Sequence, residues 1–413
     1  MSSLGGARLA LCVLRSGSLA GPSLLYCFRQ YPKRNMLAMA PKGAVQSICS
    51  RALSAMAGQR ESETWDIDLM DHSNELRIAD SSKQFRRFIA DPSLARTVVK
   101  CLRPWEHGAS GPVIFECNPG PGFVTQTLLD AGAKVVALES QTDFLPSLQA
   151  LKNNADGQLS VVYCDFFKLD PLGHGSMAPP AMYSETLFED LGINPVPWSA
   201  DVPVRIFGVF SQRNESNFLW KNIFSIYEKR SIYRYGRIEL NMYISEKQYR
   251  KLITPPGNMR DYQALSALYQ VACDIQLLHM EPWSSFMTPS RFRGMAIPRS
   301  VLLPNDHMCL VKFTPRRDLF TEYLTPTSSN MFVIMLKQCL ARRKVKLMDR
   351  LNSWDPGNGL DLIRAVGLPE DIKTGNITPD QYKLLFEAME HSESFGKNCL
   401  FPEMLENVHC AGV

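Results

Sequence analysis

The sequence predicts an α/β fold in which a parallel sheet is followed by a small helical C-terminal domain. Strand and helix patterns alternate closely between residues 113 and 165, which implies right-handed crossovers between parallel strands. A turn rich in glycine and proline at 118–122 joins one of these strands directly to a helix. After residue 318 the apolar residues follow helical spacing. With 413 residues, the chain has room for two to four domains.

The composition is that of a folded protein that begins with a basic leader. Hydrophobic residues make up 45% of the chain and charged residues 21%, which excludes a wholly disordered protein. No apolar run approaches the roughly 18 residues that span a bilayer, so we expect no membrane protein. Residues 1–60 contain eight of the 45 basic residues and none of the 41 acidic ones, so residues 61–413 carry 37 basic residues against 41 acidic ones.

This leader predicts a mitochondrial transit peptide at 1–58, because an inside-negative membrane potential draws an acid-free, basic helix inward. A disordered basic tail would have the same composition. A secretory signal fits less well, since the apolar run at 9–14 is only six residues long. We expect cleavage between residues 50 and 59, followed by a flexible lead-in at 59–82.

The 11 cysteines and seven histidines show no metal-ligand spacing, and no Cys-x-x-Cys pair is present. We therefore expect no metal and a reducing environment. Cys164 and Cys273 are predicted to be free, buried thiols.

The predicted elements alternate in order from residue 83 onward. Helical spacing of apolar residues begins the series, and Asp91-Pro92 fits a helix start inside it. The elements of this part are a helix at 83–101, strands at 113–117, 134–139 and 159–165, and helices at 123–131 and up to about residue 154.

Residues 168–203 interrupt this order with six prolines and are predicted to form a long loop. The alternation then resumes and completes a main domain at 83–317, which precedes the helical domain at 318–413. The later elements are strands at 204–210, 238–244, 275–280 and 308–313, and helices at 218–232, 262–271, 332–347 and 382–389.

The turn at 118–122 and two acidic residues predict a nucleotide-binding site. Gly120 and Gly122 would allow a ligand to approach the backbone where a Cβ atom would clash. Glu139 ends the next strand about 20 residues further on, where a carboxylate can accept hydrogen bonds from both hydroxyls of a ribose. Asp165 ends the third strand at the same edge of the sheet, where ligands of open α/β sheets bind.

Two other interpretations of this turn stay open. It could be a tight connection between strand and helix that binds nothing. It could also belong to a dinucleotide enzyme, although the run 120–125 lacks the third glycine of that fingerprint. Two acids on successive strand ends fit S-adenosylmethionine better, with one acid for the ribose and the other for the adenine amine.

Five short stretches carry a family resemblance. They are 87–92 (RFIADP), 115–120 (FECNPG) followed by Thr125, 161–167 (VVYCDFF), 282–286 (PWSSF) and 342–344 (RRK). Together they resemble motifs of the ribosomal RNA adenine dimethyltransferases, over residues 83–350 and most closely in the mitochondrial branch. The resemblance implies a Rossmann-like class I methyltransferase sheet with a small helical C-terminal domain, and methyl transfer from S-adenosylmethionine to adenine N6.

The resemblance also implies which residues contact the cofactor. They are Ile89, Asn118, Gly120, Glu139 and Asp165. Asn118 stands where the family has a glycine, and Arg86-Arg87 stand where the family's lid motif has Gln-Asn. Because the second glycine and both acids are kept, we expect cofactor binding to survive better than catalysis.

The catalytic loop departs most from the family. There, Asn-Leu-Pro-Tyr supplies hydrogen-bond acceptors for the adenine amine and an aromatic ring that stacks on the flipped base. Here the loop reads Val209-Phe210-Ser211-Gln212, and Val209 has no acceptor, although Phe210 and Phe286 could still stack a base. Losing one positioned acceptor costs roughly 10²–10³ in rate. We therefore expect weak or absent methyl transfer and assign no catalytic residue.

Two basic clusters predict contacts with nucleic acid. The cluster in 205–237 is interleaved with tyrosines, a mixture that suits single strands, whose bases stack and whose phosphates pair with cations. The second cluster lies at 342–350. Solvated helix faces would look the same, and the acidic balance after residue 60 argues against nonspecific coating of DNA. The assigned residues are Arg230, Arg234, Arg237, Arg342, Arg343 and Lys344.

Two functions follow from these observations. The resemblance to the mitochondrial branch implies a transcription initiation factor, a monomer of the matrix nucleoid that holds melted promoter DNA. Its partners would be the single-subunit mitochondrial RNA polymerase and a mitochondrial HMG-box transcription factor. The alternative is an enzyme that uses S-adenosylmethionine to dimethylate adjacent adenosines of small-subunit mitochondrial ribosomal RNA. Val209 discriminates between the two, because an active methylase needs an acceptor there.

Overall fold

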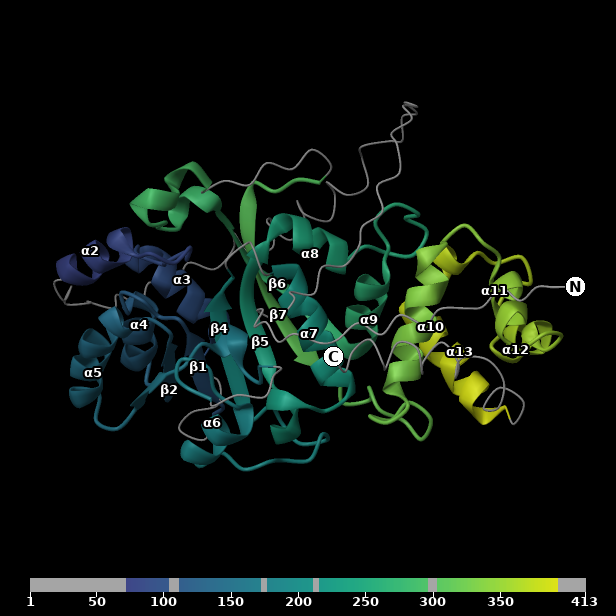
Figure 1. Cartoon of the computed structure of the whole chain (residues 1–413), viewed down its shortest axis with the longest axis horizontal. Coiled ribbons are helices and arrows are strands. Elements are labelled where there is room, and N and C mark those ends of the chain that lie inside the picture. The colour runs from purple at the N-terminus through teal and green to yellow at the C-terminus, as the bar shows by residue number, and fades with distance from the viewer. Residues whose placement is uncertain (1–71, 104–110, 172–176, 211–214, 296–302, 393–413) are drawn as a thin grey trace, which may run out of the picture. The chain divides into compact units, whose positions relative to one another are not determined.

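A computed structural model describes residues 72–103, 111–171, 177–210, 215–295 and 303–392, which form a seven-stranded sheet with helices packed around it (Figure 1). This arrangement confirms the predicted α/β class. The strands are β1 (Val113–Cys117), β2 (Val135–Glu139), β3 (Leu159–Tyr163), β4 (Val204–Val209), β5 (Glu239–Ser245), β6 (Cys273–Pro282) and β7 (His307–Pro315). The α-helices are α2 (Ser73–Ser81), α3 (Pro92–Leu102), α4 (Phe123–Asp130), α5 (Leu145–Asn153), α6 (Ser184–Asp190), α7 (Glu215–Tyr227), α8 (Glu246–Leu252), α9 (Ala264–Ala272), α10 (Ser329–Ala341), α11 (Leu347–Trp354), α12 (Gly359–Ala365) and α13 (Pro379–His391).

The strand order is β3-β2-β1-β4-β5-β7-β6. The first five strands are parallel, and β7 runs antiparallel to both β5 and β6. The sequence predicted each strand but not this antiparallel edge, because β7 enters the sheet between two strands that precede it in the chain. The carboxyl ends of the five parallel strands meet at one edge, where ligands of such sheets bind.

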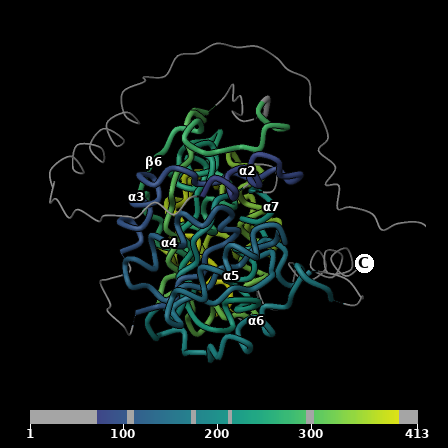
Figure 2. The backbone as a smooth tube through the Cα atoms, turned by 90° about the vertical axis from the view of Figure 1, so that its left-hand side faces the viewer, coloured from purple at the N-terminus to yellow at the C-terminus, as the bar shows by residue number. Residues whose placement is uncertain are grey.

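Alternate residues of the central strands face two separate cores. In β1, Ile114 packs into the core that includes α3 and α4, whereas Phe115 packs into the core that includes α7 and α9. Both side chains are buried. A strand that is covered on both faces is a nearly continuous run of apolar residues in the sequence. These strands could therefore be predicted from the sequence. Figure 2 shows α2, α3, α4 and α5 together on the side nearest the viewer.

The C-terminal helices share a core with the sheet. Phe332 of α10 packs against Tyr227 of α7, with ring centroids 5.7 Å apart. The Tyr262 hydroxyl donates a hydrogen bond to the carbonyl of Ile377 at 3.1 Å. No strand follows Pro315 in the part of the chain that the structure describes. The domain boundary near residue 318 stays a prediction.

Two predicted boundaries at the start of the main domain need correction. Part of the supposedly flexible lead-in forms α2, whose Ala79 is fully buried; the transit peptide and residues 59–71 lie outside the described residues. The helix predicted from residue 83 begins only at Pro92. Asp91 caps it by accepting a hydrogen bond from the Ser93 N–H, and a residue before proline avoids helical backbone.

Residues 84–88, which we call the lid segment, therefore do not extend the helix. Phe88 exchanges two backbone hydrogen bonds with Met287, each 2.9 Å long, and so forms an antiparallel bridge. The long loop at 168–203 is not structureless either, because it contains α6, whose Leu187 and Phe188 are buried.

Candidate cofactor site and nucleic-acid surface

The turn after β1 is covered by the lid segment. Gly120 has a φ of +59°, a left-handed backbone conformation that glycine adopts without strain. A Cβ atom at this position would lie 2.5 Å from Cδ1 of Phe88. The sequence predicted that a ligand approaches the backbone here, but in the structure the group that approaches is a phenyl ring of the same chain.

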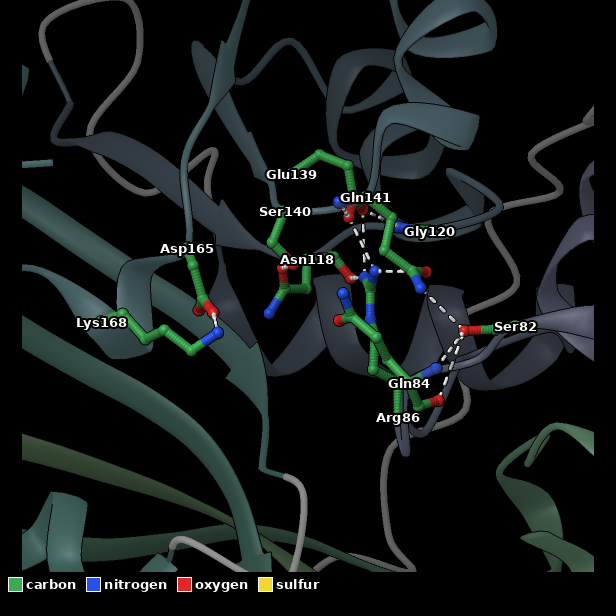
Figure 3. A network of polar contacts seen from close by, with 10 residues as sticks. All are labelled: Ser82, Gln84, Arg86, Asn118, Gly120, Glu139, Ser140, Gln141, Asp165 and Lys168. Atoms are coloured by element: carbon green, nitrogen blue, oxygen red, sulfur yellow. Dashed lines mark hydrogen bonds and ion pairs between the residues drawn. The ribbon is translucent and has the colours of Figure 1, made fainter. Parts of the chain in front are cut away.

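Glu139, at the end of β2, is fully buried, and its carboxylate is completely hydrogen-bonded (Figure 3). Nη1 of Arg86 lies 2.7 Å from Oε1, and Nη2 lies 3.0 Å from Oε2. The backbone N–H groups of Gly120 and Gln141 donate to the same carboxylate, at 3.0 and 2.7 Å. A carboxylate offers about four lone-pair positions, so these four donors fill it.

Arg86 is itself held firmly. Its Nη2 donates to the carbonyl of Asn118 at 2.8 Å, and its Nη1 donates to Oε1 of Gln141 at 2.9 Å. Its guanidinium carbon lies 4.9 Å from the ring centre of Phe88 and 5.6 Å from that of Phe144, within the range of cation–π attraction. Arg86 is 7% exposed, so the ion pair with the β2 carboxylate is shielded from water.

Asp165 follows β3 at the same edge of the sheet (Figure 3). Its carboxylate lies 2.9 Å from Nζ of Lys168 and accepts a hydrogen bond from the N–H of Phe167 at 3.2 Å. The Lys168 side chain is 66% exposed, so water screens this ion pair and a ligand can displace the lysine at little cost. The two predicted acids therefore differ, because only Asp165 stays available.

A cavity of about 580 Å³ opens at this edge, within the usual size range of ligand pockets. Its wall combines cationic side chains with phenyl rings. Glu139 is not part of the wall, because Arg86 covers its carboxylate. The lining residues are Gln84, Phe85, Arg86, Arg87, Asn118, Ser140, Asp165, Phe167, Lys168, Val209, Phe210, Asn217, Phe218 and Lys221.

The degenerate catalytic loop contributes Val209 and Phe210 to this cavity. Phe210 is buried, and its ring centre lies 4.9 Å from that of Phe167 and 4.8 Å from that of Phe218. The ring that could stack on a base is therefore packed in an aromatic cluster of the protein. Ser211 and Gln212 lie outside the described residues.

The structure places two other predicted residues in the core rather than at the cavity. Phe286 is buried and packs edge-on against Tyr243, with ring centroids 5.1 Å apart. Ile89 is also buried, in the core that includes α3 and α4. Neither side chain lines the cavity. A base can reach the face of Phe286 only if the surrounding core is displaced.

Burial shifts the pKa values of three ionisable groups near the site. It raises the pKa of Glu116 to about 8, even though the Thr125 hydroxyl donates to Oε2 at 2.6 Å. It raises the pKa of Glu215, the first residue of α7, to about 7, and it lowers the pKa of Arg87 to about 10. The raised pKa of Glu116 favours its protonated form at pH 7 and so reduces the negative charge beneath the turn.

The assignment of Arg237, in the first basic cluster, to nucleic-acid contact was wrong. Arg237 is buried and donates hydrogen bonds to the carbonyls of Trp198, Ala200 and Pro315, at 2.9, 2.7 and 3.0 Å. These contacts tie the start of β5 to the end of β7 and to the preceding loop. The guanidinium is not available to nucleic acid, because three backbone acceptors already hold it.

Two other arginines of this cluster are exposed but paired. Arg230 lies 3.3 Å from Glu228, and Arg234 lies 3.3 Å from Glu185. Ion pairs this exposed are weak, so phosphates can compete for both arginines.

The second basic cluster is built on two adjacent segments, 342–347 and 372–375. The N–H of Leu347 donates to the carbonyl of Ile372 at 2.8 Å, and Lys346 forms an antiparallel bridge with Lys373. Arg343 differs from its neighbours, because it donates to the carbonyls of Arg260 and Tyr262 at 3.2 and 2.9 Å. Its main role is therefore to fix these segments to the loop before α9.

The remaining four cations form what we call the cationic surface. Its residues are Arg342, Lys344, Lys346 and Lys373, all exposed. Within the described ranges, no ion pair joins any of the four to an acidic side chain. Like charges that face each other across a bridge repel, so this surface favours an external anion. The sequence assigned Arg342 and Lys344 to nucleic-acid contact, placed Lys346 in the same basic cluster and missed Lys373.

Two kinds of feature are absent from the described part of the chain. No helix there has both the length and the apolar character needed to cross a bilayer. No group of three or more His, Cys, Asp or Glu residues there is arranged to hold a metal ion.

A model of the ribosomal RNA adenine dimethylase family matches residues 81–391. The chain belongs to this family. It is 43% identical over 334 residues to dimethyladenosine transferase 2, mitochondrial, of Homo sapiens, over 80% of this chain and 84% of that one. It is 44% identical over 310 residues to the Rattus norvegicus protein of the same name, over 74% and 78%. A crystal structure of a dimethyladenosine transferase from Plasmodium falciparum aligns with a TM-score of 0.47 and 13% identity, over 72% of this chain and 95% of that one.

Ribosomal RNA adenine dimethylases use S-adenosylmethionine, and the two acids that we predicted to bind it lie at the carboxyl edge of the sheet. The five predicted cofactor residues divide into three groups. Asn118 and Asp165 line the cavity, Gly120 and Glu139 lie beneath the lid segment, and Ile89 lies in the core. As arranged, the site does not fit the ribose of the cofactor, because donors of the chain itself fill the carboxylate that would receive the two hydroxyls.

Proposed function

We propose that this member of the family is a mitochondrial transcription initiation factor in which methyl transfer is weak or absent. The observation that carries the proposal is the reaction centre. Val209 offers no acceptor for an adenine amine, and Phe210 is packed into an aromatic cluster. The missing acceptor alone lowers the rate roughly 10²–10³-fold. A fold with this centre serves better as a binding scaffold than as an enzyme.

The partners follow from the resemblance to the mitochondrial branch. They are the single-subunit mitochondrial RNA polymerase, a mitochondrial HMG-box transcription factor and the melted promoter strand. The cationic surface supports the contact with DNA, because four exposed cations without acidic partners suit a phosphate backbone. The relatives' names and the acid-free leader support a mitochondrial location, which we take to be the matrix nucleoid.

A second candidate function is dimethylation of adjacent adenosines in small-subunit mitochondrial ribosomal RNA, with S-adenosylmethionine as donor. Membership of the family and the available Asp165 favour it. The chain's own residues would then have to orient the adenine amine through backbone carbonyls, because the first residue of the loop is Val209.

Promoter-dependent run-off transcription tests the first proposal. The mature chain is combined with purified polymerase and HMG-box factor, without S-adenosylmethionine, and is compared with a Glu139→Gln/Asp165→Asn variant whose folding is checked by thermal melting. We expect full-length transcripts with both proteins and none when the chain is omitted. If the chain adds no transcript, the initiation role is wrong. If only the variant fails although it is folded, the carboxylates take part and the scaffold interpretation is wrong.

A methylation assay on a small-subunit ribosomal RNA fragment tests the second candidate. We expect little methyl incorporation with the wild-type chain and more with Val209→Asn, which restores an acceptor at the start of the loop. Val209→Leu is the matched control, since it changes size without adding an acceptor. Incorporation at full stoichiometry by the wild-type chain would establish the second function instead.

A further inference from the structure

We propose that Arg86 occupies the ribose subsite of the family's cofactor site, so that the chain binds S-adenosylmethionine only after this arginine has left. Arg86 is then the residue that sets the affinity for the methyl donor. This inference goes beyond the transcription role and does not depend on it.

The geometry of the ion pair matches the geometry of the ligand it replaces. A ribose presents two neighbouring hydroxyls that would donate to the two oxygens of one carboxylate. Arg86 presents two guanidinium nitrogens to the same two oxygens of Glu139, at 2.7 and 3.0 Å. With the N–H groups of Gly120 and Gln141, the carboxylate already has four donors, and two more cannot be added.

Several contacts besides the ion pair fix the side chain of Arg86 in this position. It is 7% exposed, donates to two further acceptors and lies against two phenyl rings. Phe88 of the same segment fills the space above Gly120 and is fixed to Met287 by two backbone hydrogen bonds. The lid segment thus covers both the carboxylate and the glycine turn that a nucleoside would use.

The second acid of the site shows why the arginine, and not any cation, decides the affinity. Lys168 also pairs with an acid, Asp165, but its side chain is 66% exposed and its ammonium makes one contact at 2.9 Å. An exposed pair of this kind contributes little, so a ligand displaces it easily. A buried, two-pronged pair must be broken completely before the donor binds, because each charge loses its partner.

The expected effect follows from the population of the open state. If breaking the two charge-assisted hydrogen bonds leaves the open state at about 1% or less, the apparent affinity for the donor falls about 100-fold or more. S-Adenosylhomocysteine should be affected to the same degree, because it carries the same ribose.

Isothermal titration of the mature chain with S-adenosylmethionine and with S-adenosylhomocysteine tests the proposal. We expect Arg86→Gln, which places the family's glutamine in the lid, to bind both ligands at least about 100-fold more tightly than the wild-type chain. Arg250→Gln is the matched control, because Arg250 also pairs with a buried carboxylate, that of Glu246 at 2.6 Å, but neither residue lines the cavity. It should leave the affinity unchanged, and Lys168→Gln should change it only a few-fold.

Two further variants and a second type of measurement keep the test decisive if Arg86→Gln is unstable on its own. The more conservative Arg86→Lys keeps the charge but loses the two-pronged contact, and it should bind the ligands with intermediate affinity. Ligand-induced increases in melting temperature should follow the order Arg86→Gln, then Arg86→Lys, then wild type. Arg86→Gln/Glu139→Gln should bind no more tightly than the wild-type chain, because the ribose acceptor is gone. If Arg86→Gln or Arg86→Lys weakens binding or leaves it unchanged, the proposal is wrong.

Discussion

The lid site, which consists of the lid segment and Glu139 beneath it, and the cationic surface both contain arginines, but charge is neutralised in the first region and exposed in the second. At the lid site, Arg86 and Glu139 neutralise each other, and both residues are buried. At the cationic surface, Lys346 and Lys373 lie opposite each other in solvent without an acidic partner in the described residues. The charges of the first region are therefore neutralised within the chain. Those of the second region are available to an external anion.

This difference separates the site for the methyl donor from the function we propose. Donors of the chain itself fill the carboxylate of the first site, whereas the four cations of the cationic surface lie exposed in the helical C-terminal part. Each of the following predictions tests one side of the comparison.

The largest expected effect comes from removing the buried partner. Glu139→Ala leaves Arg86 buried without its carboxylate, and breaking such a pair costs about 3–5 kcal/mol of unfolding free energy. Asp165→Ala is the control, since its partner Lys168 is exposed, and it should cost about 1 kcal/mol or less. Urea unfolding measures both. Equal losses in the two variants would show that the lid site is not specially buried.

A smaller loss of unfolding free energy is expected when Gly120, which lies beneath the lid segment, is substituted. Gly120→Ala adds a Cβ atom 2.5 Å from the ring of Phe88 at a left-handed φ of +59°, which should cost about 2–4 kcal/mol. Gly132→Ala is the matched control, because its φ is +77° but no atom lies within 4 Å of the added carbon. Thermal melting should show the larger loss for Gly120→Ala. Similar losses of melting temperature in the two variants would mean that the lid segment moves aside at little energetic cost.

The cationic surface should affect binding rather than stability. Arg342→Gln/Lys344→Gln/Lys346→Gln removes three phosphate partners, which should weaken single-stranded DNA binding roughly 50-fold at physiological salt and lower the salt slope by about 2. Fluorescence anisotropy across a salt series measures both quantities. The control removes the same charge from exposed positions elsewhere, and its residues are Lys100, Lys134 and Lys152. If both triple variants bind equally well, the cationic surface is not the DNA contact.

A last effect depends on pH. Burial raises the pKa of Glu116 from 4.5 to about 8, so the folded protein keeps a proton that the unfolded chain loses. The unfolding free energy should therefore fall as the pH rises from about 4.5 to about 8. Glu116→Gln removes this dependence and can still accept the hydrogen bond of Thr125. We expect the variant to be more stable than wild type by about 1 kcal/mol or more at pH 8, with the gain shrinking toward pH 5. A gain that is constant with pH would contradict a protonated Glu116.

The fold was largely predictable from the sequence because its main signals are local. Each of the strands β1, β2 and β3 is a short apolar run, and the turn at 118–122 is marked by its own residues. The order of β6 and β7 was not predictable, because their pairing is decided by contacts between residues that are far apart in the sequence. The predicted start of the first helix failed because Pro92 and its cap outweigh the apolar spacing before them.

The candidate site was predictable in its acids but not in their partners. Glu139 and Asp165 were placed at the sheet edge by strand ends alone, which the structure reproduces. Arg86 and its carboxylate are 53 residues apart, and the only signal was an arginine where the family has glutamine. Arg237 was misassigned because a sequence shows a positive charge but not the three carbonyls that hold it.

The bridge between Phe88 and Met287 gives the lid segment a second point of attachment. Met287 comes directly after the 282–286 stretch, so the beginning and the end of the main domain are tied together at one residue pair. A displacement of the lid backbone at Phe88 must either break both of these backbone hydrogen bonds or move the stretch around Trp283 with it. Opening of the lid is thereby mechanically coupled to a tryptophan that lies under Arg87, and its intrinsic fluorescence should report the movement.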